Sequence, residues 1–155
     1  MKEIERKFLV NKNALPSLDL LDHIVITQGY LLNTKEKTVR VRLSNNTAFI
    51  TIKGATSGIS RDEYEYQIPY DEAQNILNDF IDQKLSKTRY IIPFAGKKWE
   101  LDIFHNHLEG LIIAEVELEN EQEVIEIPSW CTEEVSQNPI YFNAQLISNN
   151  QQSFK

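Results

Sequence analysis

Hydrophobic and polar residues alternate along most of this chain. Near its start, Ile4 and Phe8 have one parity, and the charged residues Glu3, Glu5 and Lys7 have the other. Successive side chains of a β-strand point to opposite faces, so this pattern predicts a strand with one apolar face and one charged face. Similar reasoning along the chain predicts eight strands, at Ile4–Val10, Ile24–Leu32, Thr38–Leu43, Thr47–Lys53, Ser60–Ile68, Lys84–Pro93, Lys98–His105 and Leu111–Leu118.

One segment has helical rather than alternating periodicity. Asp71 and Gln74 resemble a capping pair, and apolar residues follow at helical spacing from Ala73 to Ile81. We expect this amphipathic helix to lie on the outer, apolar face of the sheet. Shorter helical segments are predicted around Leu15–Leu21 and from Glu121, Thr132 and Tyr141, and residues 148–155 are predicted to fray.

The charged faces of the predicted strands are rich in arginine. Four of the five arginines, Arg40, Arg42, Arg61 and Arg89, occupy alternating positions. A planar guanidinium binds two phosphate oxygens at once, whereas a face that is merely solvated is served equally well by Lys, Thr or Ser. Carboxylates take similar positions, so a sheet closed with these faces inward would enclose charges of both signs. A sheet half exposed to water would show the same alternation.

The first strand suggests metal and phosphate chemistry. Glu3 and Glu5 would lie about 7 Å apart along one strand face, where two carboxylates repel each other. A divalent cation between them removes this repulsion, and the ammonium of Lys7 then suits an anion bound to the cation.

Composition limits the function classes. A chain of 155 residues is predicted to form one domain spanning 1–155, and its net charge of −7 disfavours binding to nucleic acid or to anionic membranes. No apolar run reaches the length of a membrane span. The single cysteine, Cys131, suggests a reducing compartment, so we expect a cytoplasmic protein, either a monomer or a homodimer.

In their order along the chain, these motifs resemble the CYTH superfamily, the triphosphate tunnel metalloenzymes, and most closely its small bacterial inorganic triphosphatases. The residues that carry the resemblance are Glu3-Ile4-Glu5-Arg6-Lys7, Gln28-Gly29-Tyr30, Arg40-Val41-Arg42, Lys53, Arg61-x-Glu63-x-Glu65, Lys87-Thr88-Arg89, Asp102 and Glu115-x-Glu117. The resemblance implies a mainly β (α+β) fold, in which an eight-stranded antiparallel β-barrel forms a tunnel and helices pack outside it. It also implies Mg²⁺ or Mn²⁺ as cofactor and hydrolysis of tripolyphosphate to pyrophosphate and phosphate.

The resemblance also implies a role for each matching residue. The metal-binding acids would be Glu3, Glu5, Asp102, Glu115 and Glu117. Substrate phosphates would be bound by Lys7, Arg40, Arg42, Lys53, Arg61, Lys87 and Arg89. Catalytic roles would fall to Lys7, Tyr30 and Lys87, and Glu63 and Glu65 would be further tunnel acids.

Other functions remain compatible with these residues. A class IV adenylyl cyclase would convert ATP to cyclic AMP and pyrophosphate in a similar tunnel. A thiamine or nucleoside triphosphatase would use the same phosphate contacts with a different organic group. A non-catalytic polyphosphate-binding module would need the bases without the full set of acids.

Overall fold

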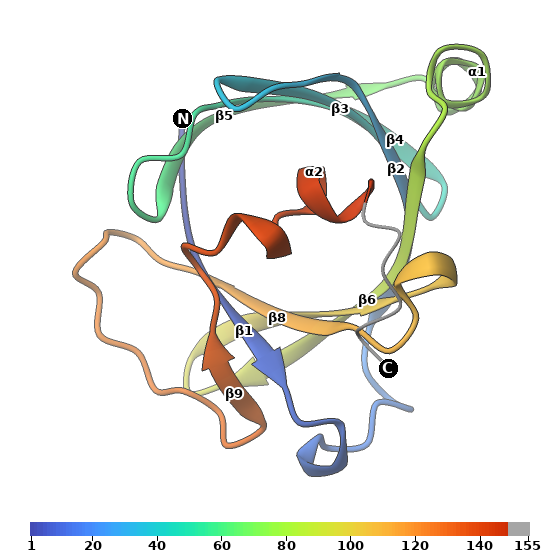
Figure 1. The fold of residues 1–155 in the computed structure, drawn as a ribbon. Coiled ribbons are helices and arrows are strands. Elements are labelled where there is room, and N and C mark those ends of the chain that lie inside the picture. The colour runs from blue at the N-terminus through green and yellow to red at the C-terminus, as the bar shows by residue number, and fades with distance from the viewer. Residues whose placement is uncertain (149–155) are drawn as a thin grey trace.

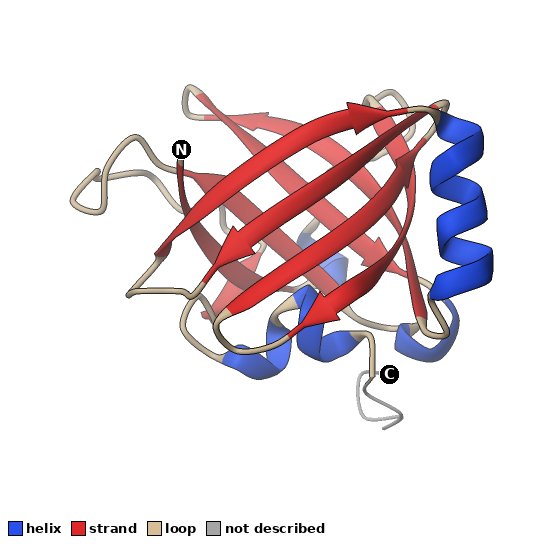
Figure 2. Cartoon of the chain, turned by 90° about the horizontal axis from the view of Figure 1, so that it is seen from above, coloured by secondary structure: helices blue, strands red, loops and turns tan. Residues whose placement is uncertain are grey.

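The computed structural model describes residues 1–148, which form a closed barrel of eight antiparallel strands (Figures 1 and 2). The order of the hydrogen-bonded strands is β5-β4-β3-β2-β6-β7-β8-β1, and pairing of β1 with β5 closes the ring. The strands are β1 (Lys2–Val10), β2 (His23–Asn33), β3 (Lys37–Ser44), β4 (Thr47–Gly54), β5 (Ser60–Ile68), β6 (Lys84–Phe94), β7 (Lys97–Phe104) and β8 (Ile112–Glu117).

The predicted fold class is confirmed, and the eight predicted strands all form. Their observed ends lie within two residues of the predicted ones. The expected hairpin turn at Asn45-Asn46 joins β3 to β4, with Asn45 in the left-handed region at a φ of 52°. Asparagine tolerates this conformation better than most residues, which suits a tight turn.

Helix α1 (Tyr70–Phe80) packs on the outside of the barrel, as predicted (Figure 2). Its buried residues Ala73 and Leu77 join Val41 and Ala48 of the sheet in one apolar cluster. The predicted capping pair does not form, because the helix begins after Pro69 and no side chain caps it. Asp71 lies instead in the first turn, where a negative charge favours the helix dipole.

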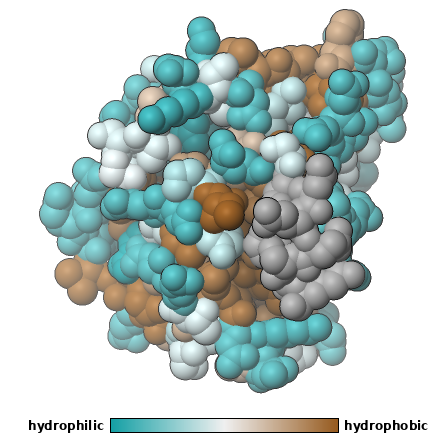
Figure 3. Space-filling view, in the orientation of Figure 1, coloured by the Kyte–Doolittle hydropathy of each residue, from teal (hydrophilic) through white to brown (hydrophobic). Residues whose placement is uncertain are grey.

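The second helix, α2 (Asn143–Leu146), lies within the ring of strands rather than on the outer face (Figure 1). Leu146 packs there against residues such as Leu85, Phe104 and Ile113 of β6, β7 and β8. From this side the middle of the ring is filled by side chains (Figure 3). An apolar cluster with α2 therefore fills one part of the barrel interior and leaves another part to the charged residues.

Three short segments differ from the sequence-based expectations. The helical segment expected from Glu121 is wrong, because residues 121–128 form an isolated turn followed by irregular structure. The helical turn expected from Thr132 is wrong, because Cys131–Glu134 forms a ninth strand, β9, that pairs with β1 beside a bulge. The helix expected at Leu15–Leu21 is also wrong, since a 3₁₀ turn, η1, lies earlier at Lys12–Ala14. Further 3₁₀ turns are η2 (Asn106–Leu108) and η3 (Pro139–Tyr141).

The predicted frayed tail falls almost wholly on residues 149–155, which lie outside the described residues. Among residues 1–148, neither α-helix has the length and apolar character needed to cross a bilayer.

The packing of α1 against the barrel depends on the absence of a side chain at Gly29, and a substitution there tests this dependence. A Cβ on Gly29 of β2 would lie 2.5 Å from Ile81 Cγ2 and 3.2 Å from the carbonyl oxygen of Gln83. We expect Gly29→Ala to lower the free energy of unfolding by about 1–3 kcal/mol, because the helix end must move. Gly54→Ala is the control, since its Cβ would meet nothing closer than 3.8 Å. Equal stabilities of the two variants in urea unfolding would contradict this account.

Candidate functional site

The barrel encloses a cavity of about 250 Å³ with a strongly charged lining. The charged residues in its wall are Glu3, Glu5, Lys7, Arg40, Arg42, Lys53, Arg61, Glu63, Glu65, Arg89, Glu100, Glu115 and Glu117. They come from seven of the eight barrel strands. Along these strands they alternate with side chains that face outward, most of which are apolar.

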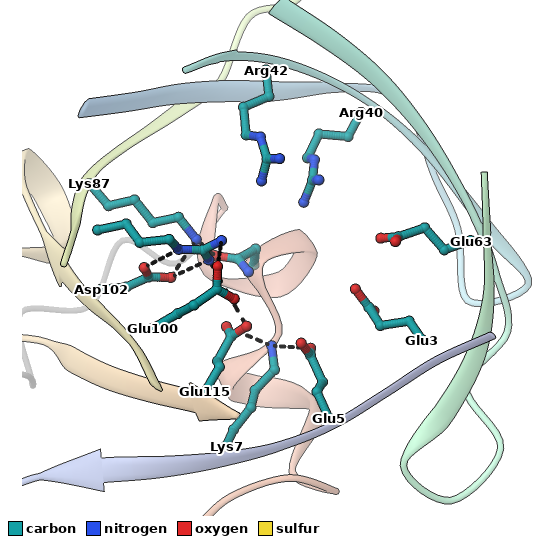
Figure 4. A network of polar contacts seen from close by, with 12 residues as sticks. Glu3, Glu5, Lys7, Arg40, Arg42, Glu63, Lys87, Glu100, Asp102 and Glu115 are labelled. Carbon is teal, nitrogen blue, oxygen red and sulfur yellow. Dashed lines mark hydrogen bonds and ion pairs between the residues drawn. The ribbon is translucent and has the colours of Figure 1, made fainter. Parts of the chain in front are cut away.

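A cluster of two acids and one base forms the wall made by β1 and β8 (Figure 4). Lys7 Nζ lies 3.7 Å from Glu5 Oε1 and 3.5 Å from Glu115 Oε1. Burial and the nearby charge of Glu115 raise the pKa of Glu5 to about 8. Burial also opposes ionisation of Glu115, but Lys7 and Arg89 outweigh it and hold the pKa of Glu115 well below its usual range. Of these two acids, Glu5 is therefore the one that holds a proton at neutral pH.

Arg40 and Arg42 project into the cavity from β3, which faces the acids across the barrel (Figure 4). Their Nη2 atoms lie 3.6 Å and 3.4 Å from the same carboxylate oxygen of Glu65. Burial, together with repulsion from Arg40 and Arg89, lowers the pKa of Arg42 to about 10. A single half-exposed carboxylate thus balances two crowded guanidinium groups, and a bound anion would relieve their repulsion.

A further base, Lys53 of β4, links two acids on neighbouring strands. Its Nζ donates hydrogen bonds to both carboxylate oxygens of Glu3, at 2.9 Å and 3.1 Å, and lies 3.3 Å from Glu63 Oε2. Arg61 lies next to this group, and its Nη2 donates to the carbonyl oxygen of Gly54 at 2.9 Å. The side of the cavity near β5 therefore holds two carboxylates bridged by one ammonium, with a guanidinium beside them.

The most buried charges lie behind the cavity wall. Asp102 accepts hydrogen bonds from Arg89 Nε at 2.7 Å, Arg89 Nη2 at 2.9 Å and Lys87 Nζ at 2.7 Å. The side chains of Asp102 and Lys87 are 0% and 1% exposed, and neither lines the cavity. Burial lowers the pKa of Lys87 to about 8, and Arg89 and Lys87 hold the pKa of Asp102 below its usual range despite its burial.

Residues near the C-terminal end of the described chain complete the site. The Lys7 ammonium lies 5.4 Å from the centre of the Phe142 ring, and Asn143 Oδ1 accepts a hydrogen bond from Lys87 Nζ at 3.1 Å. Ser136 Oγ accepts a hydrogen bond from the backbone N–H of Lys7 at 2.9 Å. The segment from β9 to α2 thereby contacts both buried lysines.

The structure brings together most of the residues selected from the sequence. Tyr30 lines the cavity with the charged residues named above, whereas Lys87 and Asp102 lie behind Arg89. The residues selected from the sequence do not include Glu100, which lines the cavity and accepts a hydrogen bond from Arg89 Nη1 at 3.0 Å. The apolar residues Trp99 and Leu101 flank it, and this alternation was the signal that could have found it.

The arrangement offers complementary walls to a small ligand. The bases of β3 can bind a polyanion, and the carboxylates of β1 and β8 can bind a hard cation that prefers oxygen ligands. Among residues 1–148, however, no three acidic, histidine or cysteine side chains stand close enough to form a ready-made metal cage. A cation bound there would need additional ligands from water or from the anion.

Comparison with known proteins identifies the family. The CYTH domain matches residues 1–147. An inorganic triphosphatase of Acetivibrio thermocellus is 43% identical over 155 residues, which cover 99% of this chain and 98% of the relative. An inorganic triphosphatase of Nitrosomonas europaea is 36% identical over 151 residues, which cover 94% and 97%.

Solved structures agree with this relationship. A crystal structure of an inorganic triphosphatase superimposes with a TM-score of 0.67 at 33% identity, and the match covers 94% of this chain and 93% of that one. A putative adenylate cyclase of Bacillus halodurans has a TM-score of 0.59 at 19% identity, over 78% and 83% of the two chains, which is a likeness of fold alone. With its charged barrel and this extent of similarity, the chain belongs to the CYTH domain family.

Proposed function

We propose that this protein hydrolyses inorganic tripolyphosphate to pyrophosphate and phosphate inside the barrel, with Mg²⁺ or Mn²⁺ as cofactor. The observation that carries the proposal is the cavity itself, in which inward bases on one wall face inward carboxylates on the other. The full-length similarity to inorganic triphosphatases favours tripolyphosphate over an organic triphosphate.

The bases of the cavity suit a chain of phosphates. Arg40, Arg42 and Arg89 are mostly buried, with side chains 9%, 15% and 11% exposed, so their charges act in a medium less polar than water. Charge-assisted hydrogen bonds from guanidinium groups to phosphate oxygens are stronger than neutral ones. In this role the three arginines hold the substrate and meet the negative charge that develops during transfer.

The carboxylates suit a hard divalent cation. Glu3, Glu5, Glu115 and Glu117 line the cavity, and their oxygen atoms are the ligand type that Mg²⁺ and Mn²⁺ prefer. Mg²⁺ keeps several water ligands and also binds phosphates, so it needs no complete protein cage. When bound, the cation neutralises phosphate oxygens and activates water.

The protein's own residues contribute position and charge to the reaction. Water attacks the terminal phosphorus, the bridging P–O bond breaks, and pyrophosphate leaves with the bridging oxygen. Lys7 remains protonated, because nearby carboxylates, Glu115 first among them, outweigh the effect of burial and raise its pKa, so it can stabilise negative charge in this part of the cavity. Tyr30 lines the same cavity, and we assign it and Lys7 to orienting the attacking water.

Asp102 and Lys87 have a different role in this proposal. Both oxygens of Asp102 already accept hydrogen bonds from Arg89 and Lys87, so the carboxylate fixes the direction of the Arg89 guanidinium. We therefore assign Asp102 to positioning Arg89 from behind, rather than to the cation. Lys87 balances the charge of Asp102 and connects the wall to Asn143 of α2.

The activity is tested by phosphate release from tripolyphosphate, pyrophosphate, ATP and thiamine triphosphate, each with Mg²⁺ or Mn²⁺. We expect tripolyphosphate to be preferred, EDTA to abolish turnover, and Glu3→Ala or Glu117→Ala to reduce kcat at least 100-fold, through lost charge stabilisation. Lys98→Ala, on an exposed side chain of β7, is the control. Cyclic AMP as the product from ATP would support a cyclase instead, and tight binding without turnover would support a binding module.

Cation binding should depend on pH through Glu5. With its pKa raised to about 8, Glu5 is protonated in the ligand-free protein at neutral pH, and a cation must displace that proton. Affinity for Mg²⁺ should therefore rise between pH 6 and pH 8 and level off above pH 8. Calorimetry in two buffers of different ionisation enthalpy would show the released proton.

Two variants make this pH test specific. Glu5→Gln should bind Mg²⁺ more weakly and release no proton, whereas Glu133→Gln, on an exposed side chain of β9, should match the wild type. An Mg²⁺ affinity of the wild type that stays constant from pH 6 to pH 9 would refute the assignment of Glu5.

The role assigned to Asp102 predicts a large effect on stability. Asp102→Asn would leave the buried charges of Lys87 and Arg89 without their counter-ion, so we expect the free energy of unfolding to fall by about 3–5 kcal/mol. Glu100→Gln removes a half-exposed partner of the same Arg89 and should cost less than about 1 kcal/mol. Urea unfolding compares the two. If Asp102→Asn has the stability of the wild type but no longer binds Mg²⁺, Asp102 is a metal ligand instead.

A further inference from the structure

Gln28 of β2 is a buried amide without a partner. Its side chain is fully buried, and neither Oε1 nor Nε2 has a hydrogen-bond partner among the described residues. Buried polar groups in native proteins are almost always paired, because an unpaired one loses its hydrogen bonds to water and gains none in return. A polar residue kept at such a position therefore requires an explanation.

Packing does not require an amide at this position. Gln28 pairs with Leu85 of β6 on one side, and Leu85 belongs to the apolar cluster around α2. A methionine has nearly the same length and shape and would suit these apolar surroundings without an unpaired polar atom. Packing alone therefore gives no reason for an amide at position 28.

The partner on the other side of Gln28 is Arg42. The register of β2 and β3 places the two residues directly opposite each other, so their side chains share the inward face with Cβ atoms about 4.5–5.5 Å apart. Arg42 Nε is also buried and unpartnered among residues 1–148. An unpaired acceptor and an unpaired donor therefore occur on neighbouring positions of one face.

The contacts that hold the Arg42 side chain are long or shared with other residues. Its Nη2 lies 3.4 Å from Glu65, a carboxylate that Arg40 and Thr51 also contact. Its guanidinium lies 6.0 Å from the centre of the Phe49 ring, at the limit of a cation–π contact. The side chain can leave these contacts when a stronger anion enters the cavity.

We infer that Gln28 is a positioning residue for Arg42: when the guanidinium turns from Glu65 to a substrate phosphate, Gln28 Oε1 accepts the Nε–H of Arg42. Both Nη groups then remain free to form a two-pronged contact with phosphate oxygens. Arginine aligned in this way loses less conformational freedom on binding. The inference rests on the proposed function, since it takes Arg42 as a substrate-binding residue.

Gln28→Met gives opposite effects on stability and on turnover. Because it removes an unpaired buried amide while keeping the shape, the melting temperature without ligand should rise by about 2–4 °C. Because Arg42 loses its support, kcat/KM for tripolyphosphate should fall about tenfold. Gln67→Met, at an exposed position of β5, should change neither.

A double-mutant comparison shows whether Gln28 acts through Arg42. Lysine at position 42 has no Nε–H group to support, so Gln28→Met should cause no further loss of kcat/KM in the Arg42→Lys background. The rise in melting temperature caused by tripolyphosphate should be smaller in Gln28→Met than in the wild type, since the ligand then binds less tightly.

The outcomes separate this inference from the proposed function. Gln28→Met with wild-type kinetics, with a lower melting temperature, or with a loss that multiplies that of Arg42→Lys would overturn the role of Gln28. A wild-type protein that does not hydrolyse tripolyphosphate would overturn the proposed function, whatever the variants show.

Discussion

Charges of opposite sign on neighbouring strands hold this barrel in one register. Lys53 of β4 is paired with Glu63 of β5, Lys7 of β1 with Glu115 of β8, and Arg89 of β6 with Asp102 of β7. The side-chain period of a strand is two, so a slip of one residue in any strand would turn its charges outward and its apolar residues inward. Because charges without partners are costly in a closed interior, this pairing specifies the register from inside, while the apolar clusters on the outer face of the sheet specify it from outside.

The order of the strands explains how one cavity can present walls of opposite character. Counted around the closed ring, β3 and β8 are four strands apart, which places them on opposite sides of an eight-stranded barrel. Arg40 and Arg42 of β3 therefore face Glu115 and Glu117 of β8 across the cavity. Adjacent acids and bases neutralise each other. Where they are separated by the width of the barrel, the bases can bind a polyanion while the acids bind its cation.

The strands and most of the inward-facing charged residues could be predicted from the sequence, because the alternation of apolar and polar residues is a local signal. The parity of Trp99 and Leu101 even indicated that Glu100 faces inward with Asp102, although the prediction did not use it. Alternation predicts the face on which a side chain lies, but it does not predict whether that side chain reaches the cavity. Lys87 and Arg89 lie on the same face of β6, yet only Arg89 lines the cavity. The difference arises because Asn143 of α2, 56 residues further along the chain, covers Lys87, and alternation within one strand carries no information about such a distant contact.

The second part of the interior shows why the charged site can exist in so small a protein. Leu85, Phe104 and Ile113 face inward like the charged residues, but they pack with Leu146 of α2 into an apolar cluster. Apolar burial at this end and beneath α1 stabilises the fold, and this offsets the like charges crowded around Arg42 and Glu5. The net charge of −7 cannot attract an anion from a distance, so local crowding of guanidinium groups has to provide the attraction. A barrel that relieved this crowding with more carboxylates near β3 would be more stable and would bind phosphate less well.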